Sequence, residues 1–110
     1  MKLIDLLENI EYAVIYGDML GTKVVDIEVN KLIYDSRKVH AQDVFVCISG
    51  AKRDAHDFIG DVINKGAKAV VVEKDITQYR YEQLREETDG KVESVSIIKV
   101  ESTRYALGCM

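Results

Sequence analysis

The sequence predicts an α/β fold in three layers, a Rossmann-like domain whose small mixed, partly parallel sheet is flanked by helices. Two apolar runs, residues 43–49 and 69–72, stand on either side of a segment with helical spacing. Together they cover about 30 residues, the size of a βαβ unit. Such a unit joins two parallel strands through a right-handed crossover. The length of 110 residues suits a single domain.

The first part of the chain predicts one helix and several strands. Apolar side chains recur at helical spacing in residues 2–10, which indicates an amphipathic helix. Residues 12–16 favour a strand, and residues 24–29 alternate apolar and acidic side chains with the period of a half-buried strand. Residues 31–34 form either another short strand or a continuation after a bend at Asn30.

The helix of the βαβ unit is indicated by its cap, its apolar face and its ending. The run at 43–49 is almost wholly apolar and favours a strand covered on both faces. Asp54 can cap the helix that follows, and Gly66 is typical of a left-handed turn at a helix end. The predicted inner face of this helix comprises Phe58, Ile59, Val62 and Ile63.

After the second buried strand, at 69–72, the pattern predicts three further elements. Residues 79–89 form a highly charged surface helix in which Leu84 faces the core. Residues 95–100 form the last strand. Ser102 caps a further helix.

Composition and charge exclude several classes of function. The net charge is −4, whereas a nucleic-acid module normally carries a basic face. No apolar run approaches the roughly 20 residues of a membrane span, and the start has no signal-peptide pattern. Cys47 and Cys109 lack metal-ligand spacing, so we expect no metal, and we favour a reducing cytoplasm over a disulfide.

A polar turn at residues 34–39 is the first candidate site. Ser36 can donate or accept a hydrogen bond, and Arg37 can bind a phosphate or carboxylate through two parallel bonds. Two interpretations stand at this point. The turn either binds an anion, or it is a structural turn in which Asp35 caps its neighbours and pairs with Arg37.

A basic loop at residues 49–56, before the predicted helix, is the second candidate site. Ligands of open α/β sheets bind beyond the carboxyl ends of parallel strands, and a helix start offers N–H groups to an anion. Lys52 and Arg53 add charge, while His56 either orients a ligand or packs against its own loop. A solvated basic turn is the alternative. The chain lacks a Gly-x-x-x-x-Gly-Lys-Ser/Thr phosphate loop, so we expect no ATP site in it.

Four segments together resemble the amino-terminal domain of the Mur ligases, of the MurE and MurF types. They combine an Asp-Ser-Arg motif, a Phe-Val run followed by a glycine, and His-Asp-Phe-Ile, and they lie at 34–39, 43–50, 54–59 and 66–72. The set is specific although no single piece is, and the resemblance covers nearly the whole chain. The opening at 1–7 and the ending at 100–107 are similar to the MurE type rather than to MurF.

This resemblance implies where a substrate binds, because the first domain of these ligases holds the UDP part of a UDP-N-acetylmuramoyl peptide. It implies that Ser36 binds the uridine diphosphate portion and that Tyr34 lines the uracil side. Asp35 and Arg37 would mainly shape the turn. The second loop is implied to contribute Ala51, Lys52 and Arg53, with His56 in support.

For a longer protein, the resemblance implies a cytoplasmic ligase of peptidoglycan biosynthesis that requires ATP and Mg. It would add a third amino acid, diaminopimelate or lysine, to UDP-MurNAc-L-Ala-D-Glu. Residues 1–110 would form its UDP-substrate domain, without catalysis or cofactor of their own, packed on a central ATP-binding domain. The apolar ending at 107–110 favours a chain that continues into central and C-terminal domains. A MurF-type ligase that adds D-Ala-D-Ala and a stand-alone α/β binding module are the alternatives.

The sequence departs from the family pattern at three places. Ala41-Gln42-Asp43 stands where Pro-Gly-Asp is common, from which we expect a change of turn stiffness only. Asp54-Ala55-His56 stands where Asp-Gly-His is common, beside the predicted site. Residues 74–94 form a longer connection than is usual, with no functional interpretation from sequence.

Overall fold

A five-stranded sheet in the order β1-β5-β4-β3-β2 forms the centre of the computed structural model, which describes residues 3–6, 10–16, 28–47, 58–73 and 76–103. The four strands β2 to β5 are parallel, and β1 pairs antiparallel with β5. The predicted mixed, partly parallel sheet is therefore confirmed. Its strands are β1 (Tyr12–Tyr16), β2 (Leu32–Ile33), β3 (Val44–Val46), β4 (Ala69–Val72) and β5 (Ser96–Val100).

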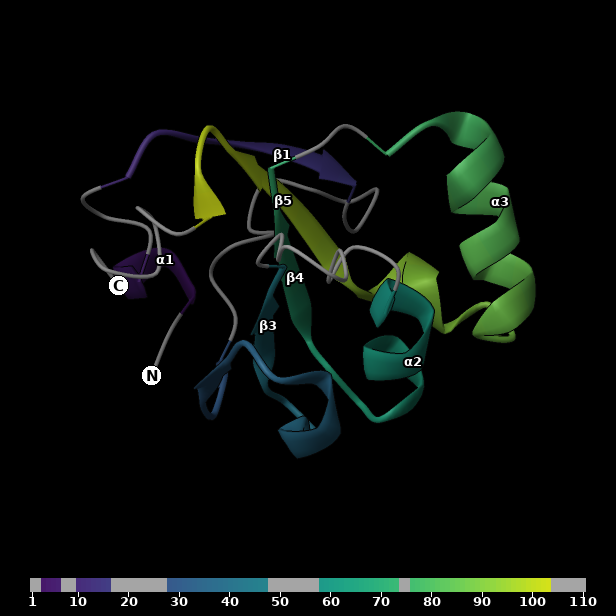
Figure 1. Ribbon diagram of the computed structural model, residues 1–110, viewed down its shortest axis with the longest axis horizontal. Coiled ribbons are helices and arrows are strands. Elements are labelled where there is room, and N and C mark those ends of the chain that lie inside the picture. Colours follow the sequence, from purple (N-terminus) through teal and green to yellow (C-terminus); the bar gives the residue numbers. More distant parts are fainter. Residues whose placement is uncertain (1–2, 7–9, 17–27, 48–57, 74–75, 104–110) are drawn as a thin grey trace.

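Helices lie on both sides of this sheet, which gives the three predicted layers. Figure 1 shows α2 and α3 on one side and the short α1 on the other. The 3-10 turns η1 and η3 follow β2 and α3 along the chain. The bounds are α1 (Leu3–Leu6), η1 (Ser36–Lys38), α2 (Ile59–Asn64), α3 (Gln78–Glu87) and η3 (Lys91–Ser94).

The core is divided in two by the alternation of side chains along the parallel strands. Phe45, Val70 and Ile97 pack against α2, α3 and η3 on one face. Val44 and Val71 belong to the opposite cluster, which includes Leu3 of α1. Every residue of β4 is buried, as expected for a parallel strand covered on both faces.

The βαβ unit has the predicted strands, and the helix between them is described from Ile59. Ile59, Val62 and Ile63 form the buried face of α2, and Gly66 has a φ of +103° after the helix. The described helix begins at Ile59, with Phe58 in the N-cap position and no side-chain cap there, and the predicted cap Asp54 lies outside the described residues. Burial of the apolar face stabilises α2.

The long segment at 74–94 contributes to the core on the α2 side. Thr77 caps α3 by accepting a hydrogen bond from Arg80 N–H, and Leu84 is buried as predicted. The buried Thr88 hydroxyl donates to Leu84 O at 2.6 Å and accepts from Val92 N–H at 3.1 Å. This pair of bonds joins α3 to η3, so the described part of the segment has a structural role.

Two predicted elements lie largely outside the described residues. Of the strand at 24–29 the structure describes Glu28, in a single bridge, and the buried Val29. Of the helix after Ser102 it describes Thr103, which is helical and buried. Across the described ranges, the helices are all too short or too polar to cross a membrane.

Candidate nucleotide-binding site

The turn after β2 is organised by Asp35. Its carboxylate caps η1 by accepting from Arg37 N–H at 3.0 Å, and it receives the guanidinium of Arg37 through Nε at 3.1 Å and Nη2 at 3.0 Å. These hydrogen bonds lower the pKa of Asp35 from 3.8 to about 2. Of the two interpretations of this turn, the structure agrees with the second, in which Asp35 caps its neighbours and pairs with Arg37.

Ser36, the predicted substrate residue, is held from a distant element. Its carbonyl oxygen accepts a hydrogen bond of 2.6 Å from Nζ of Lys65, which directly follows α2. Val39 closes the turn by packing into the core on the α2 side. Tyr34 remains 63% exposed at the start of the turn, so its ring is accessible to a ligand.

Lys65 is the residue of this region that sequence reasoning missed. A lysine at the end of a helix normally indicates no more than a favourable interaction with the helix dipole. Its contact with Ser36 joins residues 29 positions apart, and no local pattern carries that information. The one available signal was its place immediately before Gly66, where the chain turns back toward the sheet.

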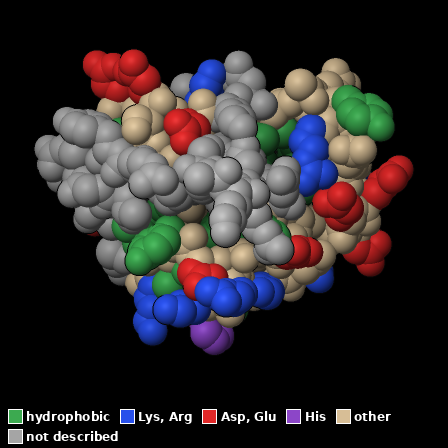
Figure 2. Space-filling view, viewed as in Figure 1, with side chains coloured by type: hydrophobic (Ala, Val, Ile, Leu, Met, Phe, Trp, Pro, Cys, Tyr) green, Lys and Arg blue, Asp and Glu red, His purple; other side chains and the backbone are tan. Residues whose placement is uncertain are grey.

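The edge that carries this turn is basic. Arg37 and Lys38 are exposed, and Lys65 lies beside them through its bond to Ser36. Figure 2 shows Lys and Arg side chains gathered with a histidine along this lower edge of the molecule. Asp35 is the acidic partner within the turn, and its charge is matched by Arg37. The electrostatics of the turn therefore favour an anion.

The carboxyl ends of β4 and β5 have the opposite character. A cavity of about 490 Å³ there is lined by three carboxylates, one lysine and two further residues, namely Glu11, Glu73, Glu101, Lys99, Tyr12 and Val100. Thr103 Oγ1 donates to Glu73 Oε1 at 2.9 Å beside it. An anionic ligand is repelled here, which distinguishes this end of the sheet from the Ser36 turn.

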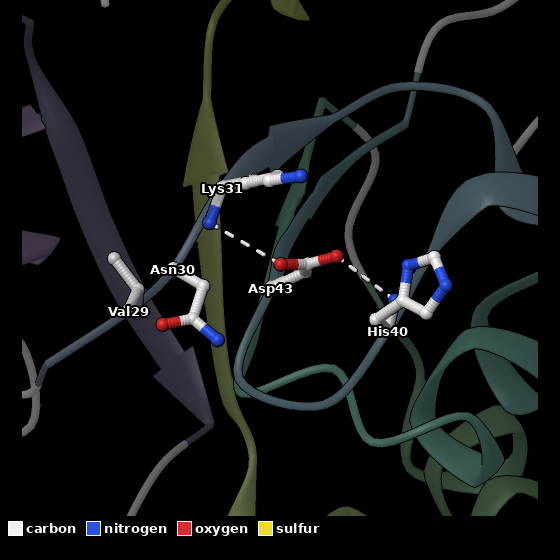
Figure 3. A pocket seen from close by; sticks show the side chains of 5 residues that line it. All are labelled: Val29, Asn30, Lys31, His40 and Asp43. Atoms are coloured by element: carbon white, nitrogen blue, oxygen red, sulfur yellow. Dashed lines mark hydrogen bonds between the residues drawn. The ribbon is translucent and has the colours of Figure 1, made fainter.

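A second cavity, of about 440 Å³, lies where β2 and β3 begin and is lined by Val29, Asn30, Lys31, His40 and Asp43 (Figure 3). Asp43 is 1% exposed. It accepts from Lys31 N–H at 3.2 Å and from His40 N–H at 2.8 Å, while the His40 ring points away from it (Figure 3). Both oxygens thus hold the backbone, which assigns Asp43 a structural role.

The second predicted loop falls outside the described residues, and so do its candidates Ala51, Lys52, Arg53 and His56. The chain enters this loop after Cys47, at the carboxyl end of β3. There β3 runs parallel to β2, with Phe45 opposite Ile33. The convergence of the two predicted loops on one ligand stays a prediction.

The chain is thus an α/β domain with a mostly parallel sheet and a turn after β2 that carries exposed cationic side chains. The chain belongs to the Mur ligase family, because the family described as "Mur ligase family, catalytic domain" matches residues 28–110. The resemblance inferred from the sequence motifs is thereby confirmed.

Several relatives carry one enzyme name. The chain is 38% identical, over all 110 residues, to the UDP-N-acetylmuramoyl-L-alanyl-D-glutamate–2,6-diaminopimelate ligase of Clostridium perfringens, and covers 19% of that protein. It is 44% identical over 77 residues, 70% of the chain and 14% of the relative, to the enzyme of that name from Alkaliphilus metalliredigens. The chain thus spans about a fifth or less of the length of these relatives.

Solved structures agree on the fold. The structure of this chain matches MurF from Acinetobacter baumannii with a TM-score of 0.67 and 21% identity, over 98% of this chain and 19% of that one. A structure of the UDP-N-acetylmuramoylalanyl-D-glutamyl-2,6-diaminopimelate–D-alanyl-D-alanyl ligase from the same organism matches with a TM-score of 0.66, 21% identity and coverage of 98% and 20%. At this identity the likeness establishes the shared fold alone.

Proposed function

We propose that these residues form the domain that binds UDP-MurNAc-L-Ala-D-Glu in an ATP-dependent ligase, which adds diaminopimelate or lysine to this substrate in peptidoglycan synthesis. The observation that carries the proposal is the 38% identity over the whole chain with a relative named for the diaminopimelate reaction. The reaction belongs to the longer protein. These 110 residues supply the anchoring of the nucleotide.

The turn after β2 supports this role chemically. Ser36 offers a hydroxyl beside exposed cationic side chains, and Tyr34 offers an aromatic ring on which a uracil can stack. Because Asp35 already occupies Arg37, we assign the first contact with the diphosphate to Ser36 and leave the shape of the turn to Asp35 and Arg37. Ala51, Lys52 and Arg53 of the second loop complete the proposed site, with His56 in support.

Anchoring the nucleotide contributes to catalysis at a distance. Binding energy from the remote part of a substrate fixes the position of its reacting carboxylate. ATP and Mg supply the activation of that carboxylate, and we place both in the central domain of the longer protein, on which this domain packs. Among the described residues no three His, Cys, Asp or Glu side chains are grouped to hold a metal ion.

The two alternatives are less well supported. A MurF-type ligase is favoured by structural neighbours, but their 21% identity with this chain speaks for the fold alone. A stand-alone module does not account for the family's match to residues 28–110. If the proposal holds, the gene continues with a Gly-x-x-Gly-Lys-Thr segment within roughly 20 residues of the last helix. We also expect the longer protein to be cytoplasmic.

A nuclear magnetic resonance titration of the 110-residue chain tests the proposal. We expect UDP and UDP-MurNAc-L-Ala-D-Glu, at up to millimolar concentration, to shift the amide signals of residues 34–38 and 51–53. Ser36→Ala should weaken binding about tenfold to a hundredfold, since a hydrogen bond to a charged group is lost. Absence of any shift at both loops in the unmodified chain would disprove the site.

A further inference from the structure

We propose that Lys65 is a positioning residue, which holds the Ser36 turn in the shape that receives the nucleotide. This inference rests on the proposed function, because it concerns how one residue of that site is held. Lys65 lies directly after α2, and its Nζ donates to the Ser36 carbonyl oxygen at 2.6 Å. The contact spans 29 positions of sequence, so it fixes a loop against a helix.

The other contacts of the turn act at its two ends. Asp35 holds the beginning of η1 through Arg37, only two residues away. Val39 holds the end by burial in the core that also contains Ile59. Lys65 holds the middle, at the residue whose side chain we expect to meet the ligand. Loss of this bond leaves the Ser36 backbone freer to rotate, although both ends of the turn stay in place.

The chemistry of an ammonium group suits this position. It has three protons to donate and no acceptor. One bond to the Ser36 carbonyl leaves donors and a full positive charge beside the proposed diphosphate.

Three variants of the 110-residue chain separate positioning from charge. Lys65→Met removes the ammonium and keeps most of the aliphatic stem, whereas Lys65→Arg keeps a charged donor. Lys31→Met is the matched control, since it removes the same charge at the start of β2, where Lys31 bonds Asp43 through its backbone N–H. The probe is UDP, followed by the amide signals of residues 34–38, and urea unfolding reports stability.

We expect Lys65→Met to weaken UDP binding about threefold to tenfold and Lys65→Arg to stay within about twofold of the unmodified chain. Lys31→Met should also stay within about twofold, and all three should unfold at nearly the same urea concentration. In the double variant with Ser36→Ala, the Lys65→Met loss should largely disappear, because the two residues act as one unit.

Two results overturn the inference while the proposed function survives. One is UDP binding by Lys65→Met as tight as that of the unmodified chain. The other is an equal loss in Lys31→Met, which would reduce the effect to general electrostatics. If the unmodified chain itself shows no response to UDP, the proposed function fails first and this inference fails with it.

Discussion

Asp35 and Asp43 each organise a turn in the connection between β2 and β3, but Asp35 is partly exposed whereas Asp43 is buried. Asp35 caps an exposed turn and is paired with Arg37, whose side chain is 85% exposed. Asp43 is buried and gives both oxygens to backbone N–H groups. Surface ion pairs contribute little to folding, whereas buried polar groups are costly when their partners are lost. The comparison separates a turn available for binding from a turn required for the fold.

The largest effect is expected at the buried turn. Asp43→Ala leaves the partly buried N–H groups of Lys31 and His40 without their acceptor. We expect a loss of about 2–4 kcal/mol in the free energy of unfolding, measured by urea denaturation. Asp43→Asn should cost less, because its amide keeps one acceptor. Asp35→Ala is the matched variant in the exposed turn, and equal losses at the two positions would invalidate the comparison.

Packing of the buried turn against the end of α2 gives the next effect. A Cβ on Gly66 would lie 2.8 Å from the Cα of Ala41, at a residue whose φ is +103°. We therefore expect Gly66→Ala to destabilise the chain by about 2–3 kcal/mol.

Gly90→Ala is the control for this experiment. Gly90 also has a positive φ, of +84°, but a Cβ there meets nothing within 4 Å. Gly90→Ala should lower the free energy of unfolding by about 1 kcal/mol, from the backbone conformation alone. If the unfolding midpoints of Gly66→Ala and Gly90→Ala coincide, the contact of Gly66 with Ala41 contributes nothing to the stability of the chain.

Local sequence information predicted the elements whose signals are local. The strand at 69–72 was predicted with its observed bounds, because an apolar run lies between polar residues and follows Gly66. The pairing of Asp35 with Arg37 was foreseen as one of two interpretations, since the residues are two positions apart. The left-handed turn at Gly66 was likewise predicted, from the glycine itself.

Features that depend on contacts between residues far apart in the sequence could not be predicted from local patterns. The predicted cap at Asp54 lies outside the described residues, and the buried face of α2 packs on strands that are distant in the sequence. The bond from Lys65 to Ser36 depends on the placement of η1 against α2. Of the candidate site, the first turn was located from its motif. Its support by a distant lysine became apparent only in three dimensions.

A smaller and opposite effect is expected at Gln42. This residue adopts a φ of 71°, in the left-handed region, between His40 and the buried Asp43. The expectation that Ala41-Gln42 in place of Pro-Gly changes only turn stiffness is thus incomplete, because a side chain is disfavoured at this φ. Gln42→Gly should stabilise the chain by about 0.5–1 kcal/mol, net of the greater freedom of glycine in the unfolded chain.

The control for Gln42 is alanine at the same position. Gln42→Ala retains a Cβ and should leave the urea midpoint nearly unchanged. Gln42→Gly should raise the midpoint without changing the slope of the transition. A gain in both variants would assign the effect to the glutamine side chain rather than to the backbone angle.

The exposed turn gives the smallest effect, and it is best measured by titration. Hydrogen bonds from Arg37 lower the pKa of Asp35 from 3.8 to about 2. A lowered pKa in the folded state means that the charged carboxylate favours the fold above pH 4 and that this contribution is lost as the pH falls toward 2. We expect the carboxyl carbon signal of Asp35 to titrate near pH 2. In Arg37→Gln it should titrate at a higher pH, though still below 3.8, because the backbone N–H of residue 37 still donates to the carboxylate. A midpoint near 3.8 in the unmodified chain would mean that Arg37 is free in solution. Arg37 would then be available to bind the nucleotide directly, and the diphosphate contact would no longer be assigned to Ser36 alone.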